Sequence, residues 1–155
     1  MSSIARNSFI FLILMSLLVL WGATITTTAT DTTDIGTKHK VLVDISNKLP
    51  DQTSFTIHCK SQDDDLGKHD VKAGQKYGFK FRVNWWGTTL FFCGASWQGN
   101  YVEFDIYRAS RDDEKRCYFH CMWEVRGDAI VGYKEGYKEP DIFIHWKKQT
   151  SHILV

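Results

Sequence analysis

Apolar and polar residues alternate along most of the chain beyond residue 40. In the clearest run, YGFKFRVNW at 77–85, an aromatic or branched residue occupies every second position and polar residues mostly fall between them. The same alternation marks residues 41–46, 54–60, 101–108, 117–125 and 141–146. A period of two predicts strands with one buried face, and no comparable run has the helical period.

Turn-forming residues separate these runs. Pro50, Gly67, Gly74, Gly87 and Gly99 all fall between two of them. Short strands joined by such turns predict an all-β fold, an antiparallel β-sandwich of about eight strands. We expect one domain over residues 40–148, with Trp85, Trp97, Trp123 and Trp146 on its inward faces.

The N-terminus has the features of a secretory signal peptide. Arg6 precedes an uncharged apolar stretch at 9–23, which is short for a membrane span, and small residues at 27 and 29 suit cleavage after Ala29. Residues 1–29 are therefore expected to be removed and 30–39 to be disordered. We expect a secreted, extracellular protein that does not insert into a membrane after cleavage.

The charge and the cysteines narrow the class further. Removing Arg6 leaves equal numbers of basic and acidic residues, which argues against a nucleic-acid partner. An even count of cysteines in a small secreted domain predicts two disulfides. Cys117 and Cys121 on one extended strand would lie about 13 Å apart, too far to bond. Cys59 would then pair with either of them, and we favour Cys59–Cys121 and Cys93–Cys117.

Several stretches occur together and in order over residues 40–146. They are VLVDISNKL, FTIHCKSQDDDLGKHDV, GQKYGFKF, TTLFFCGASW, FDIY and CYFHCMWEV. On these residues the chain resembles the plant self-incompatibility protein family, also called S-protein homologues. The resemblance implies a small secreted β-sandwich with two disulfides and no known catalytic activity. It also implies a ligand like the founding members, which are secreted by the stigma and recognised by a membrane protein on incompatible pollen.

Three aspartates, Asp63, Asp64 and Asp65, follow the strand that ends near Cys59. Their spacing is not that of an EF-hand loop, and adjacent carboxylates beside lysines are expected to stay ionised rather than act as a glycosidase pair. Asp side chains accept backbone N–H groups in turns, and Gly67 supplies a position with positive φ. We interpret the cluster first as turn chemistry and second as a recognition edge.

Two further features are candidate partner contacts. Trp86 has the opposite parity to its neighbours and lies beside a turn, so its ring is expected to be exposed. The polar segment 108–116 is the longest run of charge, and we expect a solvated loop there. Its candidate contacts are Arg111, Asp112, Asp113, Glu114 and Lys115.

No catalytic residues, metal site or cofactor are predicted. Oxidised cysteines leave no Cys–His pair, and the spacing of the histidines suggests no nucleophile. The expected function is that of a non-enzymatic extracellular ligand for a plasma-membrane or cell-wall protein, acting as a monomer. The alternative is a secreted carbohydrate-binding module of the cell wall, suggested by the sandwich and by Trp86.

Overall fold

The computed structural model describes residues 37–148, and the expected signal peptide at 1–29 lies outside them. In order, the elements are β1 (Thr37–Asn47), β2 (Phe55–Lys60), β3 (Asp65–Val71), β4 (Lys76–Asn84), β5 (Leu90–Trp97), β6 (Asn100–Arg108), α2 (Ala109–Asp112), β7 (His120–Val125), β8 (Ala129–Tyr133), β9 (Pro140–His145) and β10 (Lys147–Lys148). In residues 37–148 no helix is long and apolar enough to cross a bilayer.

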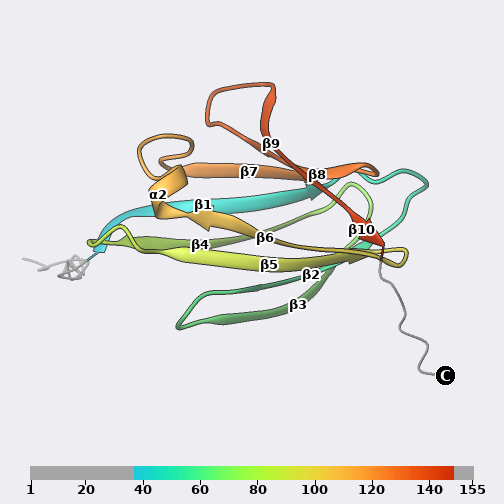
Figure 1. Ribbon diagram of the computed structural model, residues 1–155, viewed down its shortest axis with the longest axis horizontal. Helices are drawn as coiled ribbons and strands as arrows, with labels where there is room; N and C mark the ends of the chain where they lie inside the picture. Colours follow the sequence, from blue (N-terminus) through green and yellow to red (C-terminus); the bar gives the residue numbers. More distant parts are fainter. Residues whose placement is uncertain (1–36, 149–155) are drawn as a thin grey trace, which may run out of the picture. The chain divides into compact units, whose positions relative to one another are not determined.

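The strands form two five-stranded sheets that face each other (Figure 1). One has the order β4-β1-β7-β8-β9 and the other the order β10-β6-β5-β2-β3. The expected antiparallel sandwich is confirmed with one exception, because β1 and β7 pair in parallel. The chain visits the second sheet between these two strands, so no hairpin fixes their relative direction.

The core lies between the sheets and is built by the alternation seen in the sequence. One sheet contributes Val43 and Ile45 of β1 and Trp123 of β7, all fully buried. Aromatic rings meet across the layers, with Phe104 and Trp123 centroids 5.4 Å apart. Burying one such side chain contributes about 1.5–3 kcal/mol, so these rows of inward residues are the main stabilising feature of the fold.

Two disulfides are present, but the predicted pairing is wrong. Cys59 bonds to Cys93, which lies directly opposite it in the β2–β5 ladder with a Cα separation of 4.0 Å. Cys117 bonds to Cys121 across a Cα separation of 5.1 Å. The elimination failed because it assumed an extended strand from residue 117, whereas β7 begins only at His120 and the preceding residues bend.

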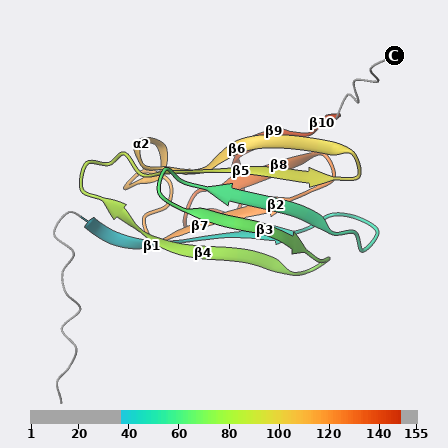
Figure 2. The ribbon, with the colours of Figure 1, turned by 90° about the horizontal axis from the view of Figure 1, so that it is seen from below.

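Several connections gather at one end of the sandwich (Figures 1 and 2). According to the strand registers, β2, β4, β6 and β8 end there, while β1, β5, β7 and β9 begin there. We call this surface the loop end. It comprises residues 61–64, 85–90, 109–119 and 134–139.

Candidate functional site

The loop end brings together the residues predicted from sequence as partner contacts. Asp63 and Asp64 lie in the β2–β3 connection and Asp65 begins β3, while Trp86 lies in the β4–β5 connection and residues 111–115 lie in and after α2. Backbone hydrogen bonds join these segments: Ala109 N donates to Thr89 O at 2.9 Å, and Glu135 N donates to Arg116 O at 2.7 Å. The β4–β5, β6–β7 and β8–β9 connections are therefore tied to one another.

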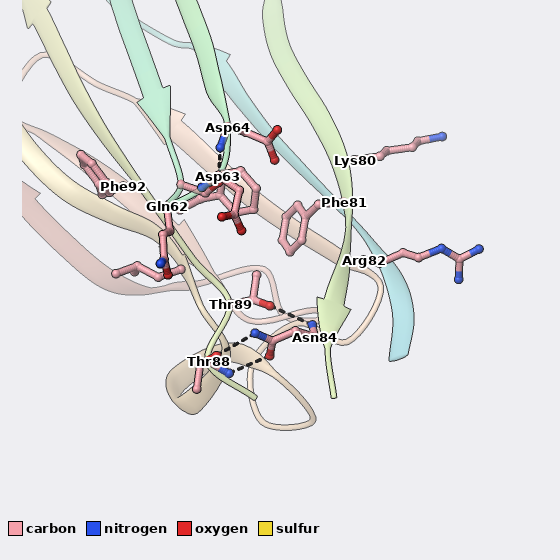
Figure 3. A pocket seen from close by; sticks show the side chains of 13 residues that line it. Gln62, Asp63, Asp64, Lys80, Phe81, Arg82, Asn84, Thr88, Thr89 and Phe92 are labelled. Atoms are coloured by element: carbon pink, nitrogen blue, oxygen red, sulfur yellow. Dashed lines mark hydrogen bonds between the residues drawn. The ribbon is translucent and has the colours of Figure 1, made fainter. Parts of the chain in front are cut away.

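A groove of about 570 Å³ lies between the β2–β3 turn and the β4–β5 connection (Figure 3). Phe81 points from β4 into it, whereas Lys80 and Arg82 point away. Asp63 and Asp64 stand on the opposite side, on the turn after β2. The groove thus has an aromatic wall, with Phe81 on it, and an acidic edge formed by Asp63 and Asp64.

Ser61, rather than an aspartate, closes the β2–β3 turn at Asp63 and Asp64. Its hydroxyl accepts hydrogen bonds from the N–H of Asp64 at 3.0 Å and of Asp63 at 3.3 Å. Among residues 37–148 the carboxylates of Asp63 and Asp64 find no hydrogen-bond partner, and both side chains are exposed. These two acids remain free to meet a partner.

Asp65 has a different role from its two neighbours. Its carboxylate lies 2.5 Å from His58 Nε2, accepts a hydrogen bond from Gly67 N at 2.9 Å, and lies 2.9 Å from Lys60 Nζ. These contacts, His58 foremost, hold the pKa of the Asp65 carboxyl well below its usual range. A general acid needs a raised pKa, so this carboxylate is unsuited to glycosidase chemistry.

The β4–β5 connection, which crosses from one sheet to the other, displays two tryptophans. Asn84 holds its base: its amide nitrogen donates to Thr88 Oγ1 at 2.7 Å, and its amide oxygen accepts from Thr88 N at 2.8 Å. Trp86 is 83% exposed, as predicted, but Trp85 is 64% exposed and its predicted core position is wrong. The β4 ladder ends at Asn84, so the strand alternation no longer determines where Trp85 points.

The segment 108–116 is not the solvated loop that its charge suggested. Asp112 is completely buried, and its carboxylate accepts hydrogen bonds from Arg108 N, from Arg111 Nε and from Arg116 Nη1, each at 2.8 Å. The prediction that Asp112 contacts a partner is therefore wrong. Arg111 and Arg116 thus pair with Asp112 inside the segment. The sequence alone could not show that these charges bond to one another rather than to water.

Asp113 is also turned inward, and this candidate contact is corrected for the same reason. It lies 3.1 Å from Lys38 Nζ and 3.3 Å from His39 Nε2 at the start of β1. Arg111 is held by Asp112 and by the carbonyl of Asp105. Of the five candidates in the segment, Glu114 and Lys115 are exposed.

Sequence reasoning missed three aromatic residues of this surface, Tyr118, Phe119 and Tyr137. Tyr118 and Phe119 are exposed, although Phe119 had the parity of a core residue. His39 stacks on Tyr118 with ring centroids 3.8 Å apart. Glu135 Oε2 accepts hydrogen bonds from the backbone N–H groups of Tyr118 and Phe119. The short Cys117–Cys121 disulfide was the signal that could have revealed these two residues, because it excludes an extended strand through 118 and 119.

In the part of the chain that the structure describes, no three His, Cys, Asp or Glu side chains are placed to hold a metal ion. His58, His120 and His39 each face a carboxylate. The chemically distinctive feature of the loop end is its set of exposed aromatic rings.

Comparisons with known proteins agree with this description. The family model for plant self-incompatibility protein S1 matches residues 42–146, from within β1 to just beyond β9. S-protein homolog 29 of Arabidopsis thaliana is 43% identical over 90 residues, 58% of this chain and 65% of its own length. S-protein homolog 24 of the same plant is 47% identical over 94 residues, 59% of this chain and 61% of its own length. The chain thus spans slightly less than two thirds of these two relatives.

More distant relatives extend the similarity. Self-incompatibility protein S1 of Papaver rhoeas is 33% identical over 110 residues, 70% of this chain and 79% of its own length. A solved self-incompatibility protein homologue has the same fold, with a TM-score of 0.57 at 21% identity, covering 74% of this chain and 99% of that one. It represents a widespread family described as small, highly stable, secreted proteins from plants. On the family-model match and these relatives, the chain belongs to the plant self-incompatibility protein S1 family.

Proposed function

We propose that this protein is a secreted, non-enzymatic recognition ligand that binds a protein on the plant cell surface through its loop end. In this proposal residues 1–29 direct secretion, and the remaining chain acts as a monomer outside the cell. Membership of the self-incompatibility family supports a role in recognition. The proposal gives that role a location on the molecule.

The distribution of exposed aromatic and aliphatic side chains carries the proposal. Nine large hydrophobic side chains are exposed in residues 37–148. Six of them lie at the loop end: Trp85, Trp86, Leu90, Tyr118, Phe119 and Tyr137. Exposed apolar patches mark interaction sites, and tryptophan and tyrosine are the residues that most often dominate binding energy.

The surroundings of these rings have the composition of an interface rim. Asp63, Asp64, Glu114, Lys115 and Lys138 are exposed charges of both signs on the same segments. Such charges add specificity more than affinity, while a central aromatic side chain supplies the affinity. The hydrogen-bonded connections hold the rings before binding, which lowers the entropic cost of association.

The test is binding of the labelled, oxidised mature chain to intact plant cells, with unlabelled protein as competitor. We expect saturable binding that Trp86→Ala weakens by about 30-fold or more, the equivalent of a hot spot of about 2 kcal/mol. Phe143→Ala is the matched control, because Phe143 is 55% exposed in the middle of β9, away from the loop end. Unsaturable binding, or equal losses in the two variants, would contradict the proposal.

A further inference from the structure

A second hollow lies on the outer face of the β10-β6-β5-β2-β3 sheet, apart from the loop-end surface. It has a volume of about 350 Å³ and is centred on Gly94 in the middle of β5. In the ladders around it, Gly94 lies opposite His58 of β2 on one side and Glu103 of β6 on the other. The hollow therefore spans neighbouring strands of a rigid sheet.

The missing side chain of Gly94 leaves room for the Tyr101 ring at the wall of the hollow. A Cβ atom at this position would lie 2.9 Å from the Tyr101 hydroxyl and 3.3 Å from Tyr101 Cε2. Tyr101 thus leans across Gly94 from β6, and its hydroxyl donates to Glu103 Oε1 at 2.6 Å. Phe92 also lines the space, so two partly exposed aromatic rings border a concave polar site.

The charges around the hollow are arranged asymmetrically. On the β2–β3 side, Lys60 and the ring of His58 already contact Asp65. Lys68, opposite His58, lines the hollow, and within the described residues its ammonium group has no ion-pair or hydrogen-bond partner. On the β6 side, Glu103 offers a carboxylate. An occupant should therefore place a negative group near β3 and hydrogen-bond donors near β6.

We propose that this hollow binds a pyranose that carries a carboxylate, a hexuronate unit of an acidic glycan. The apolar C–H face of the ring would pack on Phe92 and Tyr101, as aromatic side chains provide apolar area at fixed geometry. The sugar carboxylate would pair with Lys68, and ring hydroxyls would donate to Glu103. The volume of the hollow falls in the range of small-ligand sites. It is enough for a short segment of glycan rather than for a folded partner.

The test is calorimetric titration of the oxidised mature protein with tri-galacturonate at pH 6. We expect saturable binding, at least tenfold weaker with the fully methyl-esterified trimer because the ester removes the negative charge. Lys68→Gln should weaken binding about fivefold or more. Lys72→Gln is the matched control, because Lys72 is exposed in the turn after β3, outside the hollow, and its loss should change affinity less than twofold.

Filling the hollow gives an independent test. Gly94→Val should weaken binding of tri-galacturonate tenfold or more, because its side chain occupies the space and displaces the Tyr101 ring. If this variant does not retain the native melting transition, Tyr101→Ala replaces it and should weaken binding about fivefold. Absence of saturable binding, equal affinity for the methyl ester, or equal losses in Lys68→Gln and Lys72→Gln would overturn the proposal.

Discussion

Replacing Asp112 by asparagine tests whether the charged segment after β6 is a structural element or a contact surface. The Asp112 side chain is fully buried, and two arginines, Arg111 and Arg116, bond to its carboxylate. Asparagine keeps the shape but removes the charge and one acceptor, and it turns an N–H₂ group toward donors. The variant therefore leaves the Arg111 guanidinium without its counter-ion and the Arg116 guanidinium with one of its two.

Removing one partner of a buried ion pair costs about 3–5 kcal/mol. The lower end applies here because Arg116 keeps a second partner, Asp141, with donor–acceptor distances of 2.6 and 2.7 Å. We therefore expect Asp112→Asn to lower the free energy of unfolding by about 3 kcal/mol. For a domain of this size that corresponds to a melting temperature lower by about 10 °C or more.

The assay is guanidinium unfolding at pH 7 of oxidised protein, followed by tryptophan fluorescence, with the m-value checked for constancy. The control is Asp141→Asn, which removes a pair whose carboxylate is partly exposed. It should cost about 1 kcal/mol or less. If Asp112→Asn were within about 1 kcal/mol of the native protein and instead lost cell-surface binding, the structural role assigned to Asp112 would be refuted.

Three further predictions concern stability. Removing the Cys59–Cys93 disulfide, which closes a loop of about 35 residues, should lower the free energy of unfolding by about 4 kcal/mol in denaturant unfolding. Removing Cys117–Cys121, which closes a loop of about five residues, should lower it by about 2 kcal/mol, and the reverse order would contradict the loop-entropy argument. Gly132→Ala would place a Cβ 2.8 Å from the buried Trp123 ring and should destabilise the fold by about 1–3 kcal/mol. Gly127→Ala, whose Cβ would lie 3.5 Å from its nearest neighbour in Pro50, should cost less, and equal melting temperatures of the two variants would contradict this. The folded-state pKa of Asp65 lies below the unfolded value of about 3.9, so its pairs stabilise the fold fully above about pH 4 and lose effect as the pH falls through the folded-state pKa. The melting-temperature difference between native protein and Asp65→Asn should therefore be largest at pH 5–7 and shrink toward pH 2.

The alternation of side chains predicted the sandwich because each strand buries one face. It worked best where a ladder continues on both sides, as in β1 and β2, whose inward residues are buried. It failed at strand ends, where Trp85 and Phe119 lie beyond the hydrogen-bonded register and project into solvent. Side-chain parity carries information only while the backbone stays extended.

The candidate site was predictable in location but not in detail. Turn chemistry identified the aspartates and Trp86, and the structure gathers them at one end of the sandwich. The burial of Asp112 depends on Arg116 and Arg111 folding back onto it, an arrangement that a local run of charges does not specify. The hollow at Gly94 depends on Tyr101 from the neighbouring strand, a contact that only the sheet register creates.

Covalent capture from the loop end tests the central claim most directly. A photo-reactive amino acid is placed at position 86 in one sample of the mature protein and at position 143 in another, and each is irradiated on intact plant cells. We predict that position 86 cross-links to one cell-surface protein, that excess unlabelled protein suppresses the product, and that position 143 does not yield it. The same product from both positions, or none from position 86 under saturating binding, would contradict recognition through the loop end.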